Sequence, residues 1–138
     1  MSKIESLAEF LRVDQEDIEV SSYDKNLFEY GNQEYLVLTN SEADKRTKEQ
    51  IEESLWAFNT GFILNHSNLS EWNERTEKAF EKMQEDLCES ANEIVKAIIT
   101  DMDEFVSDAI SADGRGHFLA GYDGEENEQD EYFIYRTN

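Results

Sequence analysis

Residues 112–136, which read ADGRGHFLAGYDGEENEQDEYFIYR, set the pattern around which the rest of the chain is organised. Four of the six glycines of the chain lie in this stretch. Because glycine reaches backbone angles that are closed to other residues, we expect a loop with a defined shape here. The end of the stretch, residues 131–136, has the pattern of a strand, and we expect that strand to join a sheet.

Two runs nearer the N-terminus, residues 27–30 and 34–39, predict the other strands of that sheet. They flank Gly31-Asn32-Gln33, which is a signal for a β-hairpin. Both faces of the run 34–39 carry apolar residues, as is typical of a strand in the middle of a sheet. Residues 18–22 predict one further, brief strand.

The first half of the chain also contains two segments with helical periodicity. Residues 2–12 form the first, in which Ser2 and Glu5 have the spacing of a capping box. The second runs from residue 41 to about residue 58, and Gly61 is expected to stop it.

The longest periodic segment begins at Ser70, after a short apolar connection at 62–64 that we expect to be buried. Its apolar stripe contains Trp72, Phe80, Met83, Leu87, Ala91, Ile94 and Ile98. Thr100 and Asp103 again have capping-box spacing, so we expect a break near residue 100 and a further helix after it.

Together these elements predict an α+β fold. A small antiparallel sheet, made of the hairpin and the C-terminal strand, is expected to pack on one face against three or four helices. The 138 residues give room for one domain, which we expect to span residues 1–138.

The charge balance of the chain limits its partners. Thirty-three acidic residues face twelve basic ones, which gives a formal net charge of −21. Phosphate groups would be repelled by this charge, so direct binding to nucleic acid or to an anionic membrane is disfavoured. The charge favours a basic partner, such as a positively charged protein groove, although a high acid content can also serve solubility alone.

The numbers of cysteines and histidines and the length of the apolar stretches bear on the location and the chemistry of the protein. The single cysteine, Cys88, excludes an internal disulfide, and no apolar stretch approaches the ~18 residues of a membrane span. We therefore expect a soluble protein of a reducing cytoplasm. His66, His117 and Cys88 form no recognisable zinc or nucleophile motif, so we expect no enzyme activity, no cofactor and no metal. Cys88 is expected to be a packing residue beside the apolar stripe.

One candidate binding surface is a row of carboxylates on the long helical segment. The row consists of Glu77, Glu81, Glu85, Glu89 and Glu93. Residues four apart on a helix climb about 6 Å per step, so a single row is sparser than the phosphates of a DNA strand. Lys78 and Lys82 interrupt the row at ion-pair spacing. The row is either a solvated helix face or part of a surface that imitates DNA.

A second candidate is the glycine-rich loop 113–126. Backbone amides beside Arg115 and His117 could bind an anion, but a helix C-cap at Gly114 with Arg115 paired to a carboxylate is the plainer interpretation. The rest of the loop contains Tyr122, Asp123, Glu125 and Glu126. The clustered carboxylates could hold a cation. The plainer interpretation is a hairpin turn at Asp123-Gly124 that leads into the last strand.

Several motifs resemble those of a family of small acidic proteins that occur in phages and on mobile elements. They are SLWAFN at 54–59, AISADGRGHFL at 109–119, YDGEE at 122–126 and YFIYR at 132–136. The resemblance covers most of the chain from about residue 34. It implies a phage setting and the host-cell cytoplasm, and by analogy of class an inhibitor of a host defence enzyme.

The main hypothesis is a non-enzymatic accessory protein that binds and inhibits a host protein, with the glutamate row and loop 113–126 as its contact surface. A basic nucleic-acid-binding surface is the expected partner, and DNA mimicry a possible means. The alternative is that loop 113–126 binds or sequesters a small anion or nucleotide-like ligand. A homo-oligomer whose loop serves folding alone is a third possibility.

Overall fold

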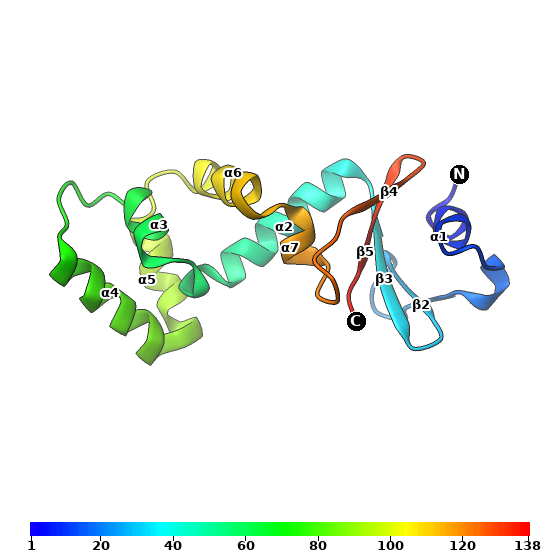
Figure 1. Ribbon diagram of the computed structural model, residues 1–138, viewed down its shortest axis with the longest axis horizontal. Coiled ribbons are helices and arrows are strands. Elements are labelled where there is room, and N and C mark those ends of the chain that lie inside the picture. The colour runs from blue at the N-terminus through cyan, green and yellow to red at the C-terminus, as the bar shows by residue number, and fades with distance from the viewer. The chain divides into compact units, whose positions relative to one another are not determined.

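The computed structural model describes residues 1–138, which form α-helices and one antiparallel sheet (Figure 1). The predicted α+β class is confirmed. The residues divide into two compact units, Met1–Thr47 with Asp113–Asn138, and Lys48–Ala112. The first unit contains the whole sheet, and the second is helical. That the chain acts as a single domain stays a prediction.

The sheet has five strands in the order β1-β2-β3-β5-β4. The strands are β1 (Glu19–Val20), β2 (Leu27–Tyr30), β3 (Gln33–Leu38), β4 (Asn127–Gln129) and β5 (Tyr132–Arg136). The predicted hairpin is β2–β3, and β3 pairs with β5 through Val37 opposite Ile134, so its predicted central place is confirmed. Strand β4, which forms a hairpin with β5, was not expected from the sequence.

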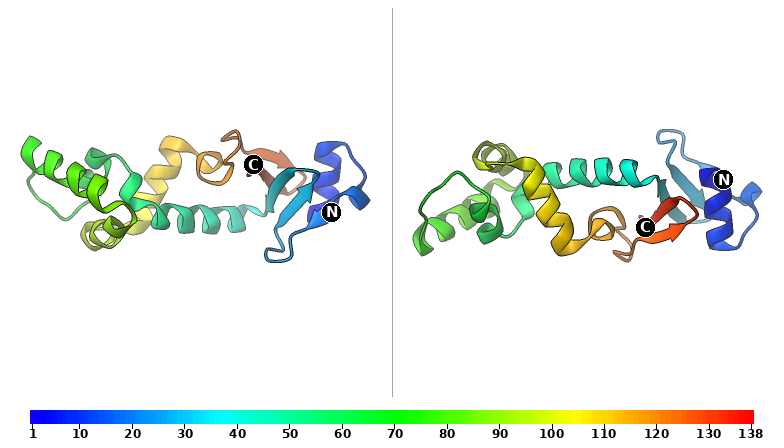
Figure 2. Two further views of the ribbon diagram at one scale, coloured as in Figure 1. Left: turned by 90° about the horizontal axis from the view of Figure 1, so that it is seen from below. Right: turned by 90° about the horizontal axis from the view of Figure 1, so that it is seen from above.

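Helices cover both faces of the sheet, so the expectation of one covered face is wrong. Tyr35 and Val37 pack on the face that carries α1 (Lys3–Leu11). Leu36 and Leu38 pack on the other face, with Ala43 at the start of α2 (Asn40–Glu53) and Leu119 at the end of α7 (Arg115–Leu119). Figures 1 and 2 show α1 and α7 on opposite sides of the sheet. Alternate residues of a strand point to opposite faces, and both sets are apolar here.

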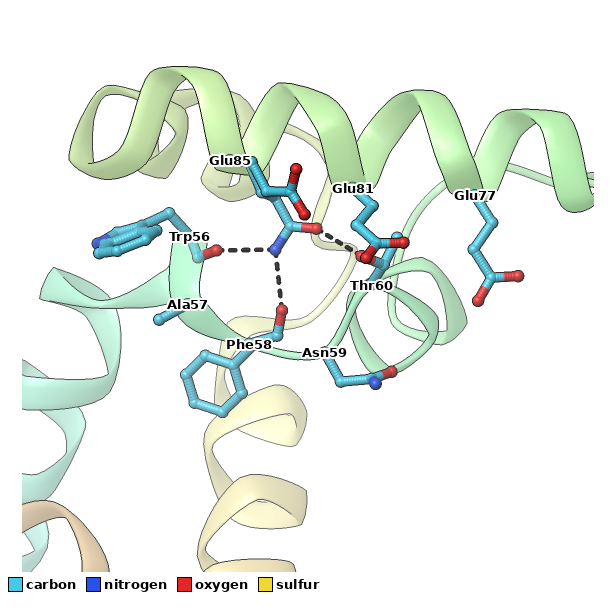
Figure 3. A pocket seen from close by; sticks show the side chains of 9 residues that line it. Trp56, Ala57, Phe58, Asn59, Thr60, Glu77, Glu81 and Glu85 are labelled. Carbon is cyan, nitrogen blue, oxygen red and sulfur yellow. Dashed lines mark hydrogen bonds between the residues drawn. The ribbon is translucent and has the colours of Figure 1, made fainter.

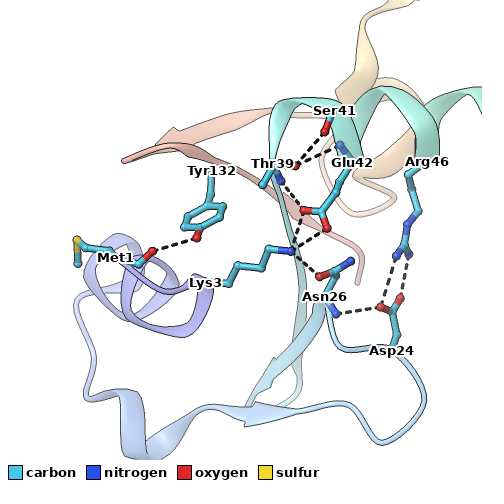
Figure 4. A network of polar contacts seen from close by, with 9 residues as sticks. All are labelled: Met1, Lys3, Asp24, Asn26, Thr39, Ser41, Glu42, Arg46 and Tyr132. Carbon is cyan, nitrogen blue, oxygen red and sulfur yellow. Dashed lines mark hydrogen bonds and ion pairs between the residues drawn. The ribbon is translucent and has the colours of Figure 1, made fainter.

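Polar contacts fix α1 to the rest of the first unit (Figure 4). The Ser2–Glu5 capping box of α1 is present, as predicted. The Lys3 Nζ atom donates to Asn26 Oδ1 at 2.6 Å and to Glu42 Oε1 at 2.8 Å. The hydrogen bond that Glu42 accepts from Lys3, together with that from the Thr39 backbone N–H, lowers the pKa of Glu42 to about 2.

The second unit is built from the end of α2 and four further helices. These are α3 (Thr60–Asn65), α4 (Glu74–Leu87), α5 (Asn92–Ile98) and the residues of α6 (Met102–Asp113) up to Ala112. Its aromatic centre is Phe105, which is fully buried and lies edge-on to the rings of Phe58 and Phe62. No helix of the chain is long and apolar enough to cross a membrane.

Two predicted helix limits are wrong. The helix predicted to end near residue 58 ends at Glu53, and the short 3-10 turn η2 (Leu55–Ala57) follows it. Gly61 does not stop a helix but lies inside α3, and the predicted apolar connection is this helix, with Ile63 and Leu64 buried.

The long periodic segment is broken at Cys88, where φ is +48° and the 3-10 turn η3 (Cys88–Ala91) begins. The break changes which residues face inward: Leu87 and Ile94 of the predicted stripe are exposed, whereas Val95 is fully buried. Cys88 is itself exposed, so its expected packing role is wrong. The predicted break near residue 100 is confirmed, but the backbone N–H of Glu104 is capped by Asp101 and not through Thr100 and Asp103.

Candidate functional site

A groove in the second unit runs between α4 and residues 56–60 (Figure 3). The floor of this groove is fixed by buried Gln84. The Gln84 Nε2 atom donates to the carbonyl oxygens of Trp56 and Phe58, at 2.8 Å each, and Thr60 Oγ1 donates to Gln84 Oε1 at 2.6 Å. The backbone N–H of Trp56 donates to Asn92 Oδ1 at 2.8 Å. These contacts hold the groove floor in one conformation.

The wall of the groove is an acidic face of α4. Glu77, Glu81 and Glu85 line it, and Figure 3 shows them along one side of the helix, with Trp56 at the Glu85 end. Their spacing of four residues places them about 6 Å apart along the helix. None of the three carboxylates takes part in an ion pair or a side-chain hydrogen bond.

The two lysines of α4 pair with other carboxylates. Lys78 lies 3.0 Å from Glu74, and Lys82 lies 3.2 Å from Asp86. Arg75, the third cation of the helix, is exposed and does not line the groove. Both lysines thus form i,i+4 ion pairs, as their spacing predicted, but these pairs leave the groove carboxylates without a neutralising charge.

The groove has a volume of about 360 Å³. Its lining combines the α4 carboxylates with Trp56 and Phe58, although the Phe58 ring itself packs against the rings of Phe62 and Phe105. Carboxylates attract a cationic group, and aromatic faces pack against an apolar stem or a planar cation. The groove is therefore suited to a basic side chain of another molecule.

The structure brings together three members of the predicted five-residue row. Glu89 lies in η3 and Glu93 in the first turn of α5, beyond the break at Cys88. The five glutamates therefore do not share one helix, although the sequence spacing of four continues without interruption.

Arg115 is held within the first unit. Its guanidinium lies 2.8 Å from Glu126 and 2.9 Å from Asp44, and it covers the Phe133 ring at 4.7 Å. It also donates to Asn40 Oδ1 at 2.9 Å. Burial acts against the charged form, but the hydrogen bonds to the two carboxylates outweigh it and raise the pKa of Arg115. The predicted pairing of Arg115 with a carboxylate is thus present.

The segment predicted as loop 113–126 contains the helix α7. Gly114 has a φ of +81° directly after α6, which fits the predicted helix end. Gly116 is buried, and a Cβ atom there would lie 2.9 Å from the backbone nitrogen of Glu126. Glu126 also accepts a hydrogen bond from Tyr135, whose pKa is raised by burial and then by this contact.

The other predicted residues of this segment lie at the surface. His117 is exposed and packs edge-on against the Phe118 ring, and Tyr122 lies 3.5 Å from the Arg136 guanidinium. Asp123 accepts from the backbone N–H of exposed Glu125 at 3.0 Å. The predicted hairpin turn at Asp123-Gly124 is wrong, because the turn between β4 and β5 contains Asp130, whose φ is +57°.

A second depression, of about 480 Å³, lies beside α6 and contains His66. The His66 Nε2 atom lies 2.7 Å from Asp108, and Nδ1 lies 2.9 Å from the carbonyl oxygen of Phe62. Burial acts against the charged ring, but these two hydrogen bonds outweigh it and raise the pKa of His66. Both ring nitrogens are thus engaged. No group of three or more His, Cys, Asp or Glu side chains is placed to hold a metal ion.

The groove floor was missed by the sequence interpretation. Trp56 and Phe58 fall inside the segment predicted as the end of a helix, and Gln84 is not among the residues of the predicted apolar stripe. A buried Gln that bonds to two backbone carbonyl groups has no signal in the periodicity of a sequence. The SLWAFN motif at 54–59, however, covers most of this floor.

No protein-family model, curated protein or solved structure matches the chain.

Proposed function

We propose that this chain is a non-enzymatic accessory protein of phage type, which binds a basic nucleic-acid-binding surface of a host protein and so inhibits it. The observation that carries the proposal is the acidic face of α4. Glu77, Glu81 and Glu85 line a groove, and no cation of the chain neutralises them.

The net charge of −21 supports the same conclusion. A field of this sign accelerates encounter with a positively charged surface and repels nucleic acid itself. A partner that normally binds phosphate groups offers clustered Lys and Arg residues, which the groove carboxylates can contact. Occupation of that surface would exclude its nucleic acid.

The test uses two variants that carry the same net charge. The groove variant is E77Q/E81Q/E85Q, and the control variant is E49Q/E89Q/E93Q, which neutralises three exposed glutamates of the same unit outside the groove. Each protein is immobilised and incubated with an extract of host cells at about 50 and about 200 mM salt.

The proposal predicts a basic protein that is retained at the lower salt, released at the higher salt and displaced by added DNA. The groove variant should fail to retain it, while the control variant should retain it as the native chain does. Retention of the host protein that does not depend on the salt concentration would contradict the proposal. An equal loss of retention in both variants would contradict it as well.

The second function considered, binding of a small anion or nucleotide-like ligand by loop 113–126, has no observation in its favour. The Arg115 guanidinium donates to Glu126, Asp44 and Asn40, and its side chain is 11% exposed.

A further inference from the structure

We infer that α4 is a latched flap, which detaches from the second unit and unfolds as one local piece while the other helices of that unit stay folded. Gln84 is the latch that holds the flap closed, and Cys88 is the hinge at which it opens. This opening does not depend on the proposed function, although the groove, which α4 lines, exists only while the flap is closed.

The packing of α4 is sparse for a helix of 14 residues, because Gln84 is its only buried residue. Its larger apolar side chains remain in part accessible to solvent: Phe80 and Met83 are half-buried, and Leu87 is 43% exposed. By contrast, α6 of the same unit buries three apolar residues, among them Phe105. Most of the stability of a helix in a protein comes from the burial of its apolar face, so α4 is attached more weakly than α6.

The attachment of α4 rests instead on three hydrogen bonds of one side chain. The Gln84 amide donates to the carbonyl oxygens of Trp56 and Phe58 and accepts from the Thr60 hydroxyl, as the dashed lines in Figure 3 mark. Hydrogen bonds are short in range, and water replaces them when the partners separate. All three are therefore lost together when α4 moves away, and the freed groups are then solvated.

The connections at both ends of α4 permit this movement. Residues 68–73, which precede the helix, are exposed and belong to no helix or strand. Cys88, which follows it, has a φ of +48° and a ψ of −127°. Residues with a Cβ atom populate such angles sparsely and keep them only where their surroundings impose them. The strain at Cys88 therefore opposes the closed form and is relieved when α4 detaches.

Detachment and unfolding of α4 are one event. An isolated helix of about this length is marginally stable in water. The repulsion between Glu77, Glu81 and Glu85, which lie four residues apart, weakens it further. The open form thus lacks the helix at residues 74–87, and α4 is a local unit of lower stability than the rest of the second unit.

Amide hydrogen exchange, followed residue by residue by NMR, detects this opening in the native chain. We expect the hydrogen-bonded amides of residues 78–87 to share one protection factor, at least about 10-fold below that of the buried residues of α6. Their protection should depend little on low concentrations of urea, because a local opening exposes little surface. Equal protection of α4 and α6 would contradict the inference.

Val106→Ala decides whether the opening is local. This substitution makes a cavity in α6, which stays folded when α4 opens. It should lower the protection of the α6 amides by about 5-fold or more and leave that of the α4 amides within about 2-fold. Equal losses in both helices would show that α4 exchanges only when the whole unit unfolds, and would overturn the inference.

Gln84→Ala tests the latch. It should lower the protection of the α4 amides by about 10-fold or more, because the closed form then contains carbonyl groups without partners. The matched control is Met83→Ala, which truncates a half-buried neighbour on the same helix and should have a smaller effect. If the two effects are equal, apolar packing and not the latch holds α4, and the inference is wrong.

Cys88→Gly tests the hinge. Glycine adopts the angles of this position without strain, so the substitution should raise the protection of the α4 amides by about 3-fold or more. Cys88→Ser retains the Cβ atom and should change it by less than about 2-fold. A Cys88→Gly variant whose α4 amides are no better protected than those of Cys88→Ser would show that no strain at this residue opposes closure, and the hinge would be refuted.

Discussion

The Arg115 site of the first unit and the groove of the second contain the same kinds of group, carboxylates beside an aromatic ring, but they differ in charge. At the first, Glu126 and Asp44 share a guanidinium supplied by the chain. At the second, the nearest lysines of α4 are paired with other carboxylates, and the acidic row has no cation. Acidic residues thus occur in two distinct settings in one chain.

The difference separates charge that is paired within the fold from charge that is unpaired at the surface. Removal of the cation from a partly buried ion pair is costly, because the carboxylate is then left without a partner. Like charges four residues apart on a helix repel one another and contribute nothing to it. Surface groups that destabilise the fold are typical of binding sites.

The largest predicted effect is the loss of the cation from the first site. Arg115→Ala should lower the free energy of unfolding by about 2–3 kcal/mol, because Glu126 and Asp44 lose their common partner and Phe133 loses packing. Urea unfolding measures this. Arg75→Ala, which removes an exposed arginine without an ion pair, should cost less than about 0.5 kcal/mol. Equal costs would remove the distinction between the two regions.

The next effect is a pH dependence in the first unit. The pKa of Glu42 is lowered from 4.5 to about 2 in the folded chain. The contribution of its ionised carboxylate to the free energy of unfolding is therefore fully present above pH 4.5 and is lost as the pH falls toward 2. After allowance for solvent screening, about 1–2 kcal/mol should be lost over this window. Other carboxylates titrate there too, so the measured quantity is the difference between the native chain and Glu42→Gln. No difference in pH dependence would contradict the role of Lys3.

A smaller effect with the opposite pH direction is expected in the second unit. The folded-state pKa of His66 is raised, so the stability from its contact with Asp108 is present below about pH 6.5 and is lost as the pH rises through the folded value. The loss should stay below about 1 kcal/mol, because Asp108 is half exposed. His117→Gln leaves a single imidazole signal for proton NMR, and Asp108→Asn should lower the pKa that this signal reports.

Much of the first unit could be predicted from the sequence, since its signals are local. The turn at Gly31-Asn32 and the alternation in 34–39 predict the hairpin and the central strand, and Ser2 predicts the start of α1. The break at Cys88 has no such signal: a non-glycine residue with φ of +48° is held there by its surroundings, and the periodicity continues through it. This break explains why the predicted five-residue row contains only three groove residues.

The groove itself could be predicted only in part. The spacing of Glu77, Glu81 and Glu85 indicated a shared helix face, and that is what the structure contains. The sequence could not predict which cation pairs with which carboxylate, because this pairing depends on side-chain rotamers and on contacts between distant segments. The floor depended on the early end of α2, which puts Trp56 into a turn opposite α4 instead of onto a helix.

The measurement that tests the central claim most directly combines stability and binding for the groove variant. Replacement of the three carboxylates should change the free energy of unfolding by no more than about 0.5 kcal/mol, because the repulsion that is removed offsets the loss of the Glu77 charge from the first turn of α4. The same variant should fail to retain the basic host protein, while the control variant retains it. A groove variant that loses stability as Arg115→Ala does, and still retains that protein, would show that these acids belong to the fold and not to a binding surface.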